Sequence, residues 1–164
     1  MSHWLITVVD RSDTAGVRDV RSLLAVYHQQ LLTEVSETSL TAELTSLPVP
    51  YVSPGGVLLL ARDEHGRAAG CIGLREHDAS ACEVKRLYVA PDARGAGLGR
   101  ALVGAAIDYA RAMGYTEMML VAIEGSADVA RHIYRSLGFE ETEPFRQVTG
   151  DCGGACVTYM RLRL

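Results

Sequence analysis

Hydrophobic residues recur along the chain with two different periods, and these periods predict where strands and helices lie. Short apolar runs bounded by glycine, proline or charged residues are typical of strands. Seven segments show this pattern: 4–9, 57–62, 68–76, 81–90, 118–123, 139–145 and 155–164. Apolar residues at steps of three and four predict amphipathic helices instead. Four segments show such stripes: 17–31, 39–47, 98–113 and 126–137. In the third segment the stripe expected to face inward consists of Leu98, Leu102, Ala105, Tyr109 and Met113.

The fourth apolar run carries an irregularity in its alternation. Its apolar residues are even-numbered at Cys82 and Val84 but odd-numbered at Leu87 and Val89, so the phase slips by one at residues 85–86. A β-bulge produces a slip of one residue, and it would splay this strand away from its neighbour. A strand that is buried on both faces without a bulge would give the same pattern, so both interpretations stand.

A glycine-rich turn follows this run and opens the next helix. Residues 94–100 are Arg-Gly-Ala-Gly-Leu-Gly-Arg. Glycine lets the backbone approach a ligand closely, and the unpaired N–H groups at a helix start attract an anion, so the turn predicts a phosphate-binding loop. Spacing excludes a dinucleotide fingerprint, which needs glycine at position 100 or 102, and a nucleoside triphosphate loop, which needs Gly-Lys-Ser or Gly-Lys-Thr at 100–102. A plain strand-to-helix turn is the alternative.

The remaining pattern, Arg-x-x-Gly-x-Gly after a Leu-Tyr-Val strand and a Pro-Asp turn, resembles the pyrophosphate loop of the GNAT superfamily of N-acetyltransferases, which bind acetyl-coenzyme A (acetyl-CoA). Residues 130–139, Ala-Arg-His-Ile-Tyr-Arg-Ser-Leu-Gly-Phe, are similar to the superfamily's second signature. Glu43-Leu44 and the run at 54–61 extend the resemblance over nearly the whole chain. Many members carry asparagine where this chain has Ala127, so a side-chain contact made there by asparagine is not expected here.

The resemblance implies both a fold and a coenzyme site. The fold is α/β, with a mostly antiparallel twisted sheet, a splayed parallel pair of central strands and flanking helices, in a single domain over residues 1–164. The pantetheine arm of acetyl-CoA is expected to pair with the backbone of the strand before the loop, as an added strand would. The expected coenzyme-binding residues are Leu87, Tyr88, Val89, Arg94, Gly95, Ala96, Gly97, Leu98, Gly99 and Arg100. No metal is expected.

The resemblance also implies the chemistry, in which an acceptor nucleophile, most often a primary amine, attacks the thioester directly. An alkyl amine of pKa ~10.4 must first lose a proton, which costs roughly 4 to 5 kcal/mol at neutral pH, so a base is needed. Glu83 is the first candidate because it precedes the proposed bulge, and Glu124, His77 and His132 follow. The alternative for each is a solvated or structural residue.

The departing coenzyme A thiolate needs a proton or a hydrogen bond, and the resemblance gives that role to Tyr134. A phenol of pKa ~10 is a weaker acid than a thiol of pKa ~8.5. Donation of a hydrogen bond to the thiolate therefore agrees with these acidities as well as full proton transfer does. The expected function is transfer of an acetyl group from acetyl-CoA to a primary amine of a small molecule or side chain. A protein N-terminal acetyltransferase and a non-catalytic acyl-CoA sensor are the alternatives.

Composition and net charge limit the classes of partner that this chain is expected to bind. The chain has 164 residues, 48% of them hydrophobic and 22% charged, and its longest uninterrupted aliphatic run is far shorter than the ~20 residues that span a bilayer. We therefore expect a soluble, cytoplasmic protein without a membrane partner. A net charge of -4 argues against a nucleic-acid partner and suits a cationic acceptor. The acceptor is a small-molecule or protein amine, and a homodimer is among the oligomeric states left open.

The four cysteines are too few and too scattered for a disulfide scaffold. Cys71 and Cys82 are expected as small core residues. Cys152 and Cys156 are expected in a loop, with a redox pair or a metal clip as the alternative.

Overall fold

The structure, a computed structural model, describes residues 3–31, 37–123, 128–147 and 157–164. Its helices are α1 (Thr14–Leu31), α2 (Glu37–Ser46), α3 (Leu98–Ala112) and α4 (Asp128–Ser136), with a short 3₁₀ helix, η1 (Pro91–Ala93), before α3. Its strands are β1 (Leu5–Val8), β2 (Val57–Arg62), β3 (Ala68–Glu76), β4 (Ala81–Val89), β5 (Glu117–Ile123), β6 (Glu140–Glu141) and β7 (Val157–Arg163). The sequence predicted each of these α-helices and strands, with ends that differ by a few residues.

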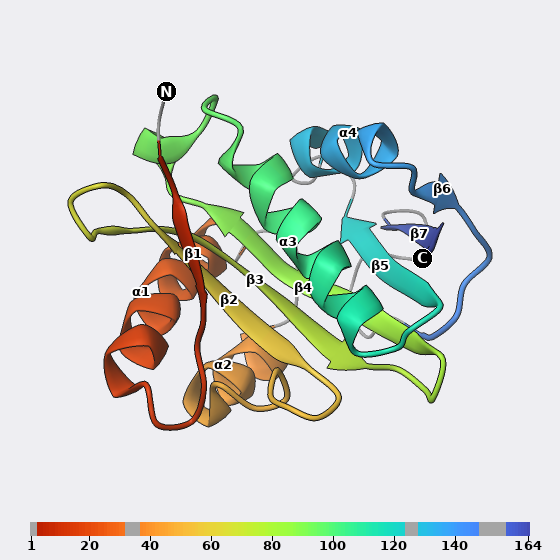
Figure 1. Cartoon of the computed structure of the whole chain (residues 1–164), viewed down its shortest axis with the longest axis horizontal. Coiled ribbons are helices and arrows are strands. Elements are labelled where there is room, and N and C mark those ends of the chain that lie inside the picture. The colour runs from red at the N-terminus through yellow and green to blue at the C-terminus, as the bar shows by residue number, and fades with distance from the viewer. Residues whose placement is uncertain (1–2, 32–36, 124–127, 148–156) are drawn as a thin grey trace.

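The strands form one seven-stranded sheet in the order β1-β2-β3-β4-β5-β7-β6. All neighbouring pairs are antiparallel except β4 and β5, which run parallel in the middle of the sheet. Parallel neighbours need a crossover connection, and here η1, the glycine-rich loop and α3 provide it (Figure 1). The predicted α/β fold, with a mostly antiparallel sheet and one central parallel pair, is therefore confirmed.

Helices cover both faces of the sheet, and the alternation of β2 shows how both faces become buried (Figure 1). The side chains of Leu58 and Leu60 pack with α1 residues such as Leu24. Val57 and Leu59 point the other way, into a cluster that includes α3 and α4. Each fully buried leucine contributes roughly 1.5 to 3 kcal/mol of transfer free energy, so β2 anchors the helices of both layers.

The bulge that the sequence indicated in β4 is present. Cys71 pairs with Tyr88 but Gly73 pairs with Lys85, so β4 has one residue more than β3 between these pairs. Even-numbered residues before the bulge and odd-numbered residues after it face α3, as the slipped alternation predicted. Arg86 lies in the bulge with a φ of 61°, and no other non-glycine residue in the described ranges has a positive φ. This left-handed conformation costs such a residue about 1 to 2 kcal/mol, so neighbouring contacts must hold it.

Two local expectations differ from the structure. The predicted inward stripe of α3 included Tyr109, but Tyr109 is 40% exposed. The helix instead buries a neighbouring stripe with small members such as Ala106 and Ala110, which let it lie close to the strands. The strand predicted at 139–145 is limited to β6, because Pro144 in this segment has no N–H group to donate to a strand ladder.

The core cysteines are where the sequence placed them, since Cys71 and Cys82 are completely buried. Cys152 and Cys156, whose role was left open, lie outside the described residues. Within the described ranges, no helix is long and apolar enough to cross a membrane.

Candidate active site

The parallel strands β4 and β5 pair over only three residues each. Residues 81–83 pair with residues 117–119, and both strands then continue without pairing to each other. We call the region beyond this point, residues 84–89 and 120–123, the splay. Its two strand edges present backbone N–H and C=O groups that are not bonded across it, so an extended ligand can pair with them as an added strand would.

The glycine-rich loop lies between β4 and α3 and has the conformation that its glycines permit. Gly95 and Gly97 have φ values of 78° and 80°, which residues that carry a side chain rarely adopt. A Cβ atom added at either position would meet nothing within 4 Å, so the space beside the loop is open. Gly97 is also the N-cap residue of α3 and offers no side-chain hydrogen bond to the first turn. The first N–H groups of α3, at the positive end of the helix dipole, therefore lack a side-chain cap, which suits a phosphate.

The two arginines of the loop are held by different neighbours. Arg94 donates from Nε to the carbonyl oxygen of Val89 at 3.0 Å, and its guanidinium carbon lies 5.8 Å from the ring centre of Tyr88. Arg100 donates to the hydroxyl of Ser136 at 2.6 Å and so ties α3 to α4. Arg94 therefore lies where the end of β4 meets the loop, whereas Arg100 also supports the packing of two helices.

Gly97→Val should weaken coenzyme binding, because valine disfavours a φ of 80° and its side chain would occupy the open space beside the loop. We expect the dissociation constant for acetyl-CoA, measured by calorimetric titration, to rise by about tenfold or more, which corresponds to about 1.4 kcal/mol.

Gly66→Val is the matched control for this experiment. Gly66 has a φ of 78° and equally open surroundings in the turn between β2 and β3, and it is not an expected site residue. The control variant thus bears the same backbone strain without a ligand site. Equal affinities for acetyl-CoA in the two folded variants would contradict a role of the loop in coenzyme binding.

The strand segment 87–89 borders the splay. Leu87 and Val89 pack toward α3, whereas Tyr88 is buried on the α1 face with its ring 5.5 Å from that of Tyr27. The Tyr88 hydroxyl is buried and has no hydrogen-bond partner among the described residues. A buried hydroxyl without a partner is costly, so a polar group of a ligand near it would stabilise this segment.

Tyr134 lies on α4 and is buried, with 6% of its surface exposed. Its ring is edge-on to Phe139, and the two ring centres are 5.3 Å apart. Burial raises the pKa of Tyr134, and the neighbouring Tyr27 raises it further. Tyr27 packs in the cluster on the α1 face of the sheet, and Tyr134 packs in the cluster on the α3 face. Because its pKa is raised, the Tyr134 hydroxyl stays protonated at neutral pH and can donate a hydrogen bond.

Glu83 is the one charged residue that is fully buried among the described residues, with 1% of its surface exposed. Its Oε2 accepts hydrogen bonds from Arg75 at 2.8 and 3.1 Å, and its Oε1 accepts them from Arg146 at 2.6 and 2.8 Å. Burial alone would raise the pKa of Glu83, but the hydrogen bonds and charges of Arg146 and Arg75 outweigh it, so this pKa is lower than usual. Glu83 is therefore ionised at neutral pH, with both carboxylate oxygens occupied.

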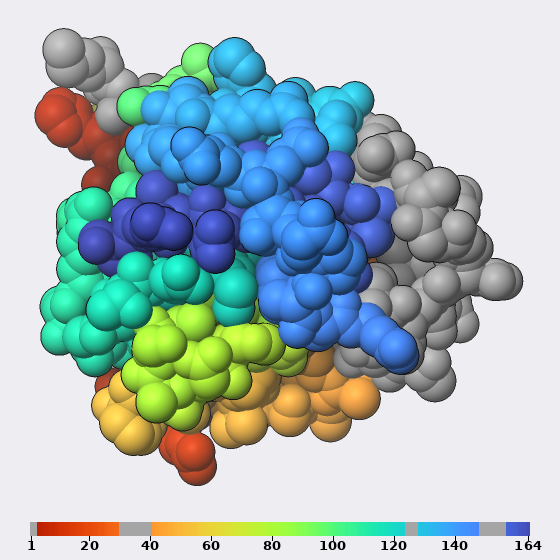
Figure 2. Space-filling model, turned by 90° about the vertical axis from the view of Figure 1, so that its right-hand side faces the viewer, coloured from red at the N-terminus to blue at the C-terminus, as the bar shows by residue number. Residues whose placement is uncertain are grey.

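Arg146 reaches Glu83 from the segment between β6 and β7. Figure 2 shows this segment, in blue, beside β7 and near the turn that joins β3 and β4. Phe145 packs edge-on to His77 and to Tyr159, with ring centres 5.4 Å apart in each case. The Tyr159 hydroxyl donates to the carbonyl oxygen of Arg146 at 2.9 Å. These contacts fix the backbone from which the Arg146 side chain extends.

Arg75, Arg146 and Lys85 belong to the site, but sequence reasoning did not identify them. Arg75 pairs directly with Glu83 across the β3–β4 hairpin, so opposite charges at equal distances from the turn were a usable signal. Arg146 carried no such signal. Lys85 lies two residues beyond Glu83, within the splay; burial and the positive charges of Arg86 and Arg75 lower the pKa of Lys85 to about 8, although Glu83 opposes this.

Neither of the two histidine candidates is buried at this site. His77 is exposed at the end of β3, and His132 is exposed on α4. Glu124 lies outside the described residues. No cluster of three histidine, cysteine or acidic side chains that could hold a metal ion occurs within the described part of the chain. Among the candidates within the described residues, Glu83 is the one that lies buried where the splay begins.

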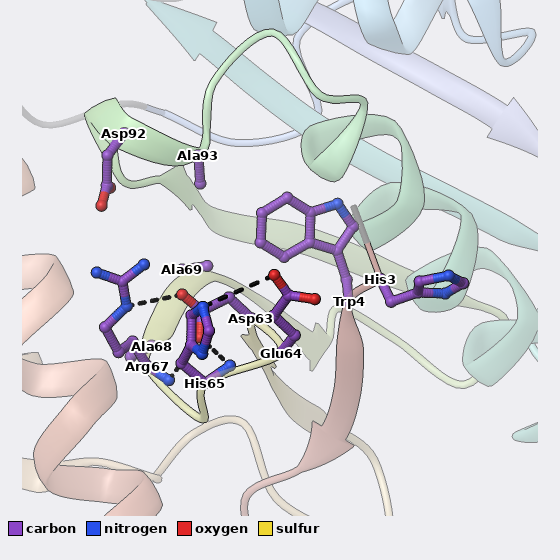
Figure 3. A pocket seen from close by; sticks show the side chains of 10 residues that line it. All are labelled: His3, Trp4, Asp63, Glu64, His65, Arg67, Ala68, Ala69, Asp92 and Ala93. Atoms are coloured by element: carbon purple, nitrogen blue, oxygen red, sulfur yellow. Dashed lines mark hydrogen bonds and ion pairs between the residues drawn. The ribbon is translucent and has the colours of Figure 1, made fainter. Parts of the chain in front are cut away.

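A separate hollow of about 200 Å³ lies between β1, the β2–β3 turn and η1 (Figure 3). Trp4 forms one wall, and the ion pair between Asp63 and Arg67, whose charged atoms are 2.8 Å apart, forms another. None of the expected coenzyme-binding or catalytic residues lines this hollow. We therefore assign it no part in the candidate site.

Comparison with known proteins tests the resemblance independently. The model of the acetyltransferase (GNAT) family matches residues 20–139. An N-acetyltransferase of Schizosaccharomyces pombe is 37% identical over 128 residues, which cover 77% of this chain and 78% of that protein. The L-amino acid N-acyltransferase MnaT of Escherichia coli is 39% identical over 79 residues, which cover 48% of this chain and 45% of that protein.

Solved structures share the fold. The crystal structure of a GNAT family acetyltransferase from Elizabethkingia anophelis with acetyl-CoA bound superimposes with a TM-score of 0.67 and 19% identity, over 98% of each chain. The family match includes both the glycine-rich loop and Tyr134. The family model matches most of the chain, and the Schizosaccharomyces pombe relative aligns with this chain over most of both proteins. The chain therefore belongs to the GNAT family of acetyltransferases, enzymes that use acetyl-CoA as co-substrate.

Proposed function

We propose that this chain transfers the acetyl group of acetyl-CoA to a primary amine, which attacks the thioester directly. One observation carries the proposal: β4 and β5 stop pairing beside a glycine-rich helix start, and the buried carboxylate of Glu83 lies where the two strands separate. A place for the pyrophosphate, an edge for the pantetheine arm and a side chain for proton transfer are thus adjacent.

The coenzyme is assigned to the loop and to the end of β4. The loop residues would offer backbone N–H groups to the pyrophosphate, and Arg94 and Arg100 would add positive charge. The open space beside Gly95 and Gly97 and the unpartnered hydroxyl of Tyr88 support this assignment. The pantetheine amides would pair with the backbone of 87–89.

Two groups on β4 are candidates for the base. Glu83 would act on the amine through a water, but its low pKa and its two arginine partners make it a weak base. Lys85 has a pKa of about 8, which is closer to the working pH and therefore better matched to removing a proton from an amine. We propose Glu83 first, because its buried carboxylate lies where the splay begins, and Lys85 second, because its pKa is the better matched of the two. The pH dependence of turnover separates them.

We assign Tyr134 to the departing thiolate as a hydrogen-bond donor. Its raised pKa makes full proton transfer to the thiolate more unfavourable than it would be for an exposed tyrosine. Donation without transfer needs no such change of ionisation, and a preorganised donor stabilises the charge that develops on the sulfur.

The charges around Glu83 favour an acceptor that carries a negative group beside its amine. Arg75, Arg146 and Lys85 lie near this single carboxylate, so positive charge is in local excess although the whole chain has a net charge of -4. This differs from the cationic acceptor that the net charge suggested. The name of MnaT describes acyl transfer to L-amino acids, which combine an amine with a carboxylate. Amino-acid-like amines are therefore the first class to test.

Release of the coenzyme A thiol from acetyl-CoA in the presence of different amines tests this function. The panel contains free amino acids, alkylamines without a carboxylate, and short peptides with a free N-terminus. Amine-dependent release, fastest with amino acids, is the expected result. Release with peptides alone would favour a protein N-terminal acetyltransferase, and binding of acetyl-CoA without amine-dependent release would favour an acyl-CoA sensor.

Arg94→Ala should weaken acetyl-CoA binding several-fold at low salt and much less at high salt, because screening shortens the Debye length from about 30 Å at 0.01 M to about 3 Å at 1 M. Titration with acetyl-CoA at both salt concentrations measures this. Arg111→Ala removes an arginine from the last turn of α3, at the other end of that helix from the loop, and is the control. A loss of affinity that is the same at both salt concentrations would contradict an electrostatic role for Arg94.

A further inference from the structure

The bulge residue Arg86 is bound by a carboxylate from a distant element. Its Nε donates to Oε2 of Glu43, on α2, at 2.6 Å, and a second guanidinium nitrogen contacts the same oxygen. The Arg86 side chain is 14% exposed and that of Glu43 is 11% exposed, so the ion pair is almost buried. A buried charge that loses its partner is strongly unfavourable, so each of these side chains holds the other in place.

Tyr51 completes this group from the loop between α2 and β2. It is completely buried, and its hydroxyl donates to Glu43. Burial raises the pKa of Tyr51, so the hydroxyl remains a donor at neutral pH. Its ring packs against Gly73, where an added Cβ atom would lie 2.8 Å from a ring carbon. Gly73 pairs with Lys85, the residue just before the bulge, so Tyr51 supports β3 beside the irregularity in β4.

Further support comes from β3 itself, where the Cys71 thiol donates to the carbonyl oxygen of Arg86 at 3.5 Å. Contacts from α2 and β3 therefore meet at one residue with a φ of 61°, and Tyr51 of the loop after α2 supports them through Glu43 and Gly73. An arginine has no intrinsic preference for this conformation, because its Cβ atom crowds the following carbonyl group. The contacts of its side chain and carbonyl supply what the backbone lacks.

We propose that Glu43, Tyr51 and Arg86 form a bulge clamp, which holds the backbone of Arg86 in its left-handed conformation and thereby positions residues 87–89 against bound acetyl-CoA. Arg86 is a positioning residue and acts through the backbone that follows it. Without the bulge, a shift of one residue would turn the side chains of this segment to the opposite faces and move its N–H and C=O groups. The effect on turnover rests on the proposed function, but the effect on the backbone can be measured without any ligand.

The experiment compares glycine with alanine at position 86. Glycine adopts a positive φ readily, so it makes the clamp unnecessary, whereas alanine does not. Both substitutions are made together with Glu43→Gln, so that neither variant leaves a carboxylate buried without a partner. Asp19→Asn is the control, because it breaks an ion pair of 2.7 Å with Arg62 on β2, a strand that does not neighbour β4.

Two measurements are made on each folded variant. Amide hydrogen exchange across residues 84–89 is measured in the coenzyme-free protein, and kcat and KM for acetyl-CoA are measured with the best amine. For the Arg86→Ala and Glu43→Gln pair we expect exchange to rise by about tenfold or more and kcat to fall by on the order of 10²-fold. The double variant with Arg86→Gly and Glu43→Gln should return both the exchange rate and kcat most of the way to their wild-type values. Asp19→Asn should change neither the exchange rate nor kcat.

The two measurements separate the clamp from the proposed function. Exchange that rises with alanine and recovers with glycine supports the clamp even if no amine is acetylated. The absence of acetylation would overturn the proposed function and leave the clamp standing. Equal exchange and equal kcat in the alanine and glycine variants would overturn the clamp. A loss of thermal stability of the same size in both, without any difference in exchange or kcat, would show that the group only stabilises the fold.

Discussion

Replacing Tyr134 by phenylalanine is expected to lower turnover by roughly 10- to 10³-fold while the affinity for acetyl-CoA stays within a few fold. The substitution removes one hydroxyl and keeps the ring that packs against Phe139. If that hydroxyl donates to the departing thiolate, its loss acts on the transition state and leaves binding of the ground state almost unchanged. Steady-state rates of thiol release and calorimetric titration measure the two effects separately.

Tyr109→Phe is the matched control for Tyr134→Phe. It removes the same group from a tyrosine on α3 that is 40% exposed and faces away from the core. This control should keep full turnover. Full turnover in folded Tyr134→Phe as well would return Tyr134 to a packing role, and a water would then be the proton source for the thiolate.

Glu83→Gln should have the largest effect on stability. The substitution leaves Arg75 and Arg146 without their shared carboxylate at a site where Glu83 is 1% exposed. Breaking a buried ion pair by removing one partner costs about 3 kcal/mol or more, which corresponds to a fall in Tm of roughly 6 to 12 °C for a chain of this size. Glu141→Gln breaks an exposed ion pair with Arg135 and should change stability by less than about 1 kcal/mol.

The stability difference between wild type and Glu83→Gln should depend on pH in one direction. Because the pKa of Glu83 is lowered in the folded protein, the stabilisation is fully present above the ordinary value of 4.5 and is lost as the pH falls through the folded value. Denaturant unfolding at several pH values should therefore give a constant difference between pH 5 and 8 and a shrinking one below. A difference that instead grows as the pH falls would contradict the ion-pair account.

The pH profile of kcat/KM assigns the base. If Glu83 removes the proton, the limb that it sets lies below its ordinary pKa of 4.5, and the profile between pH 5 and 8 reflects the acceptor amine alone. If Lys85 removes the proton, a limb appears near pH 8 and is absent from Lys85→Met. Turnover lowered by Glu83→Gln, with the limb of Lys85 still present but moved to lower pH because Glu83 no longer raises the pKa of Lys85, would leave Glu83 an organising role and Lys85 the proton transfer.

Much of the fold could be read from the sequence, because burial on two faces leaves regular patterns. The uninterrupted apolar run of β2, the helix starting at Leu98 and the slip of phase in β4 each correspond to an observed feature. Tyr109 was misplaced because α3 carries apolar residues around more than one stripe. Periodicity alone then cannot choose the face, and close approach to the sheet selects the stripe with the smallest side chains.

The part of the candidate site that lies in one segment of the chain was predictable, and the part that is assembled from distant segments was not. The loop at 94–100 is one segment, so its glycine spacing identifies it. The partners of Glu83 come from β3 and from the segment after β6. The partner of Arg86 is Glu43 on α2, which also accepts a hydrogen bond from Tyr51 in the loop after α2. Such pairings depend on strand register and on the packing of a distant loop, which leave no local signal at Arg146 or Glu43.

The bulge in β4 makes the site depend on a count of residues as well as on their identities. One additional residue at Arg86 reverses which face every later side chain of the strand occupies, much as an inserted nucleotide changes a reading frame. Deleting that residue would leave Glu83, Leu87, Val89 and the whole loop in the sequence. The side chains of Leu87 and Val89 would then face the α1 layer instead of the α3 layer. Between Glu83 and Arg94, changes in chain length should therefore be tolerated far less than changes in residue type.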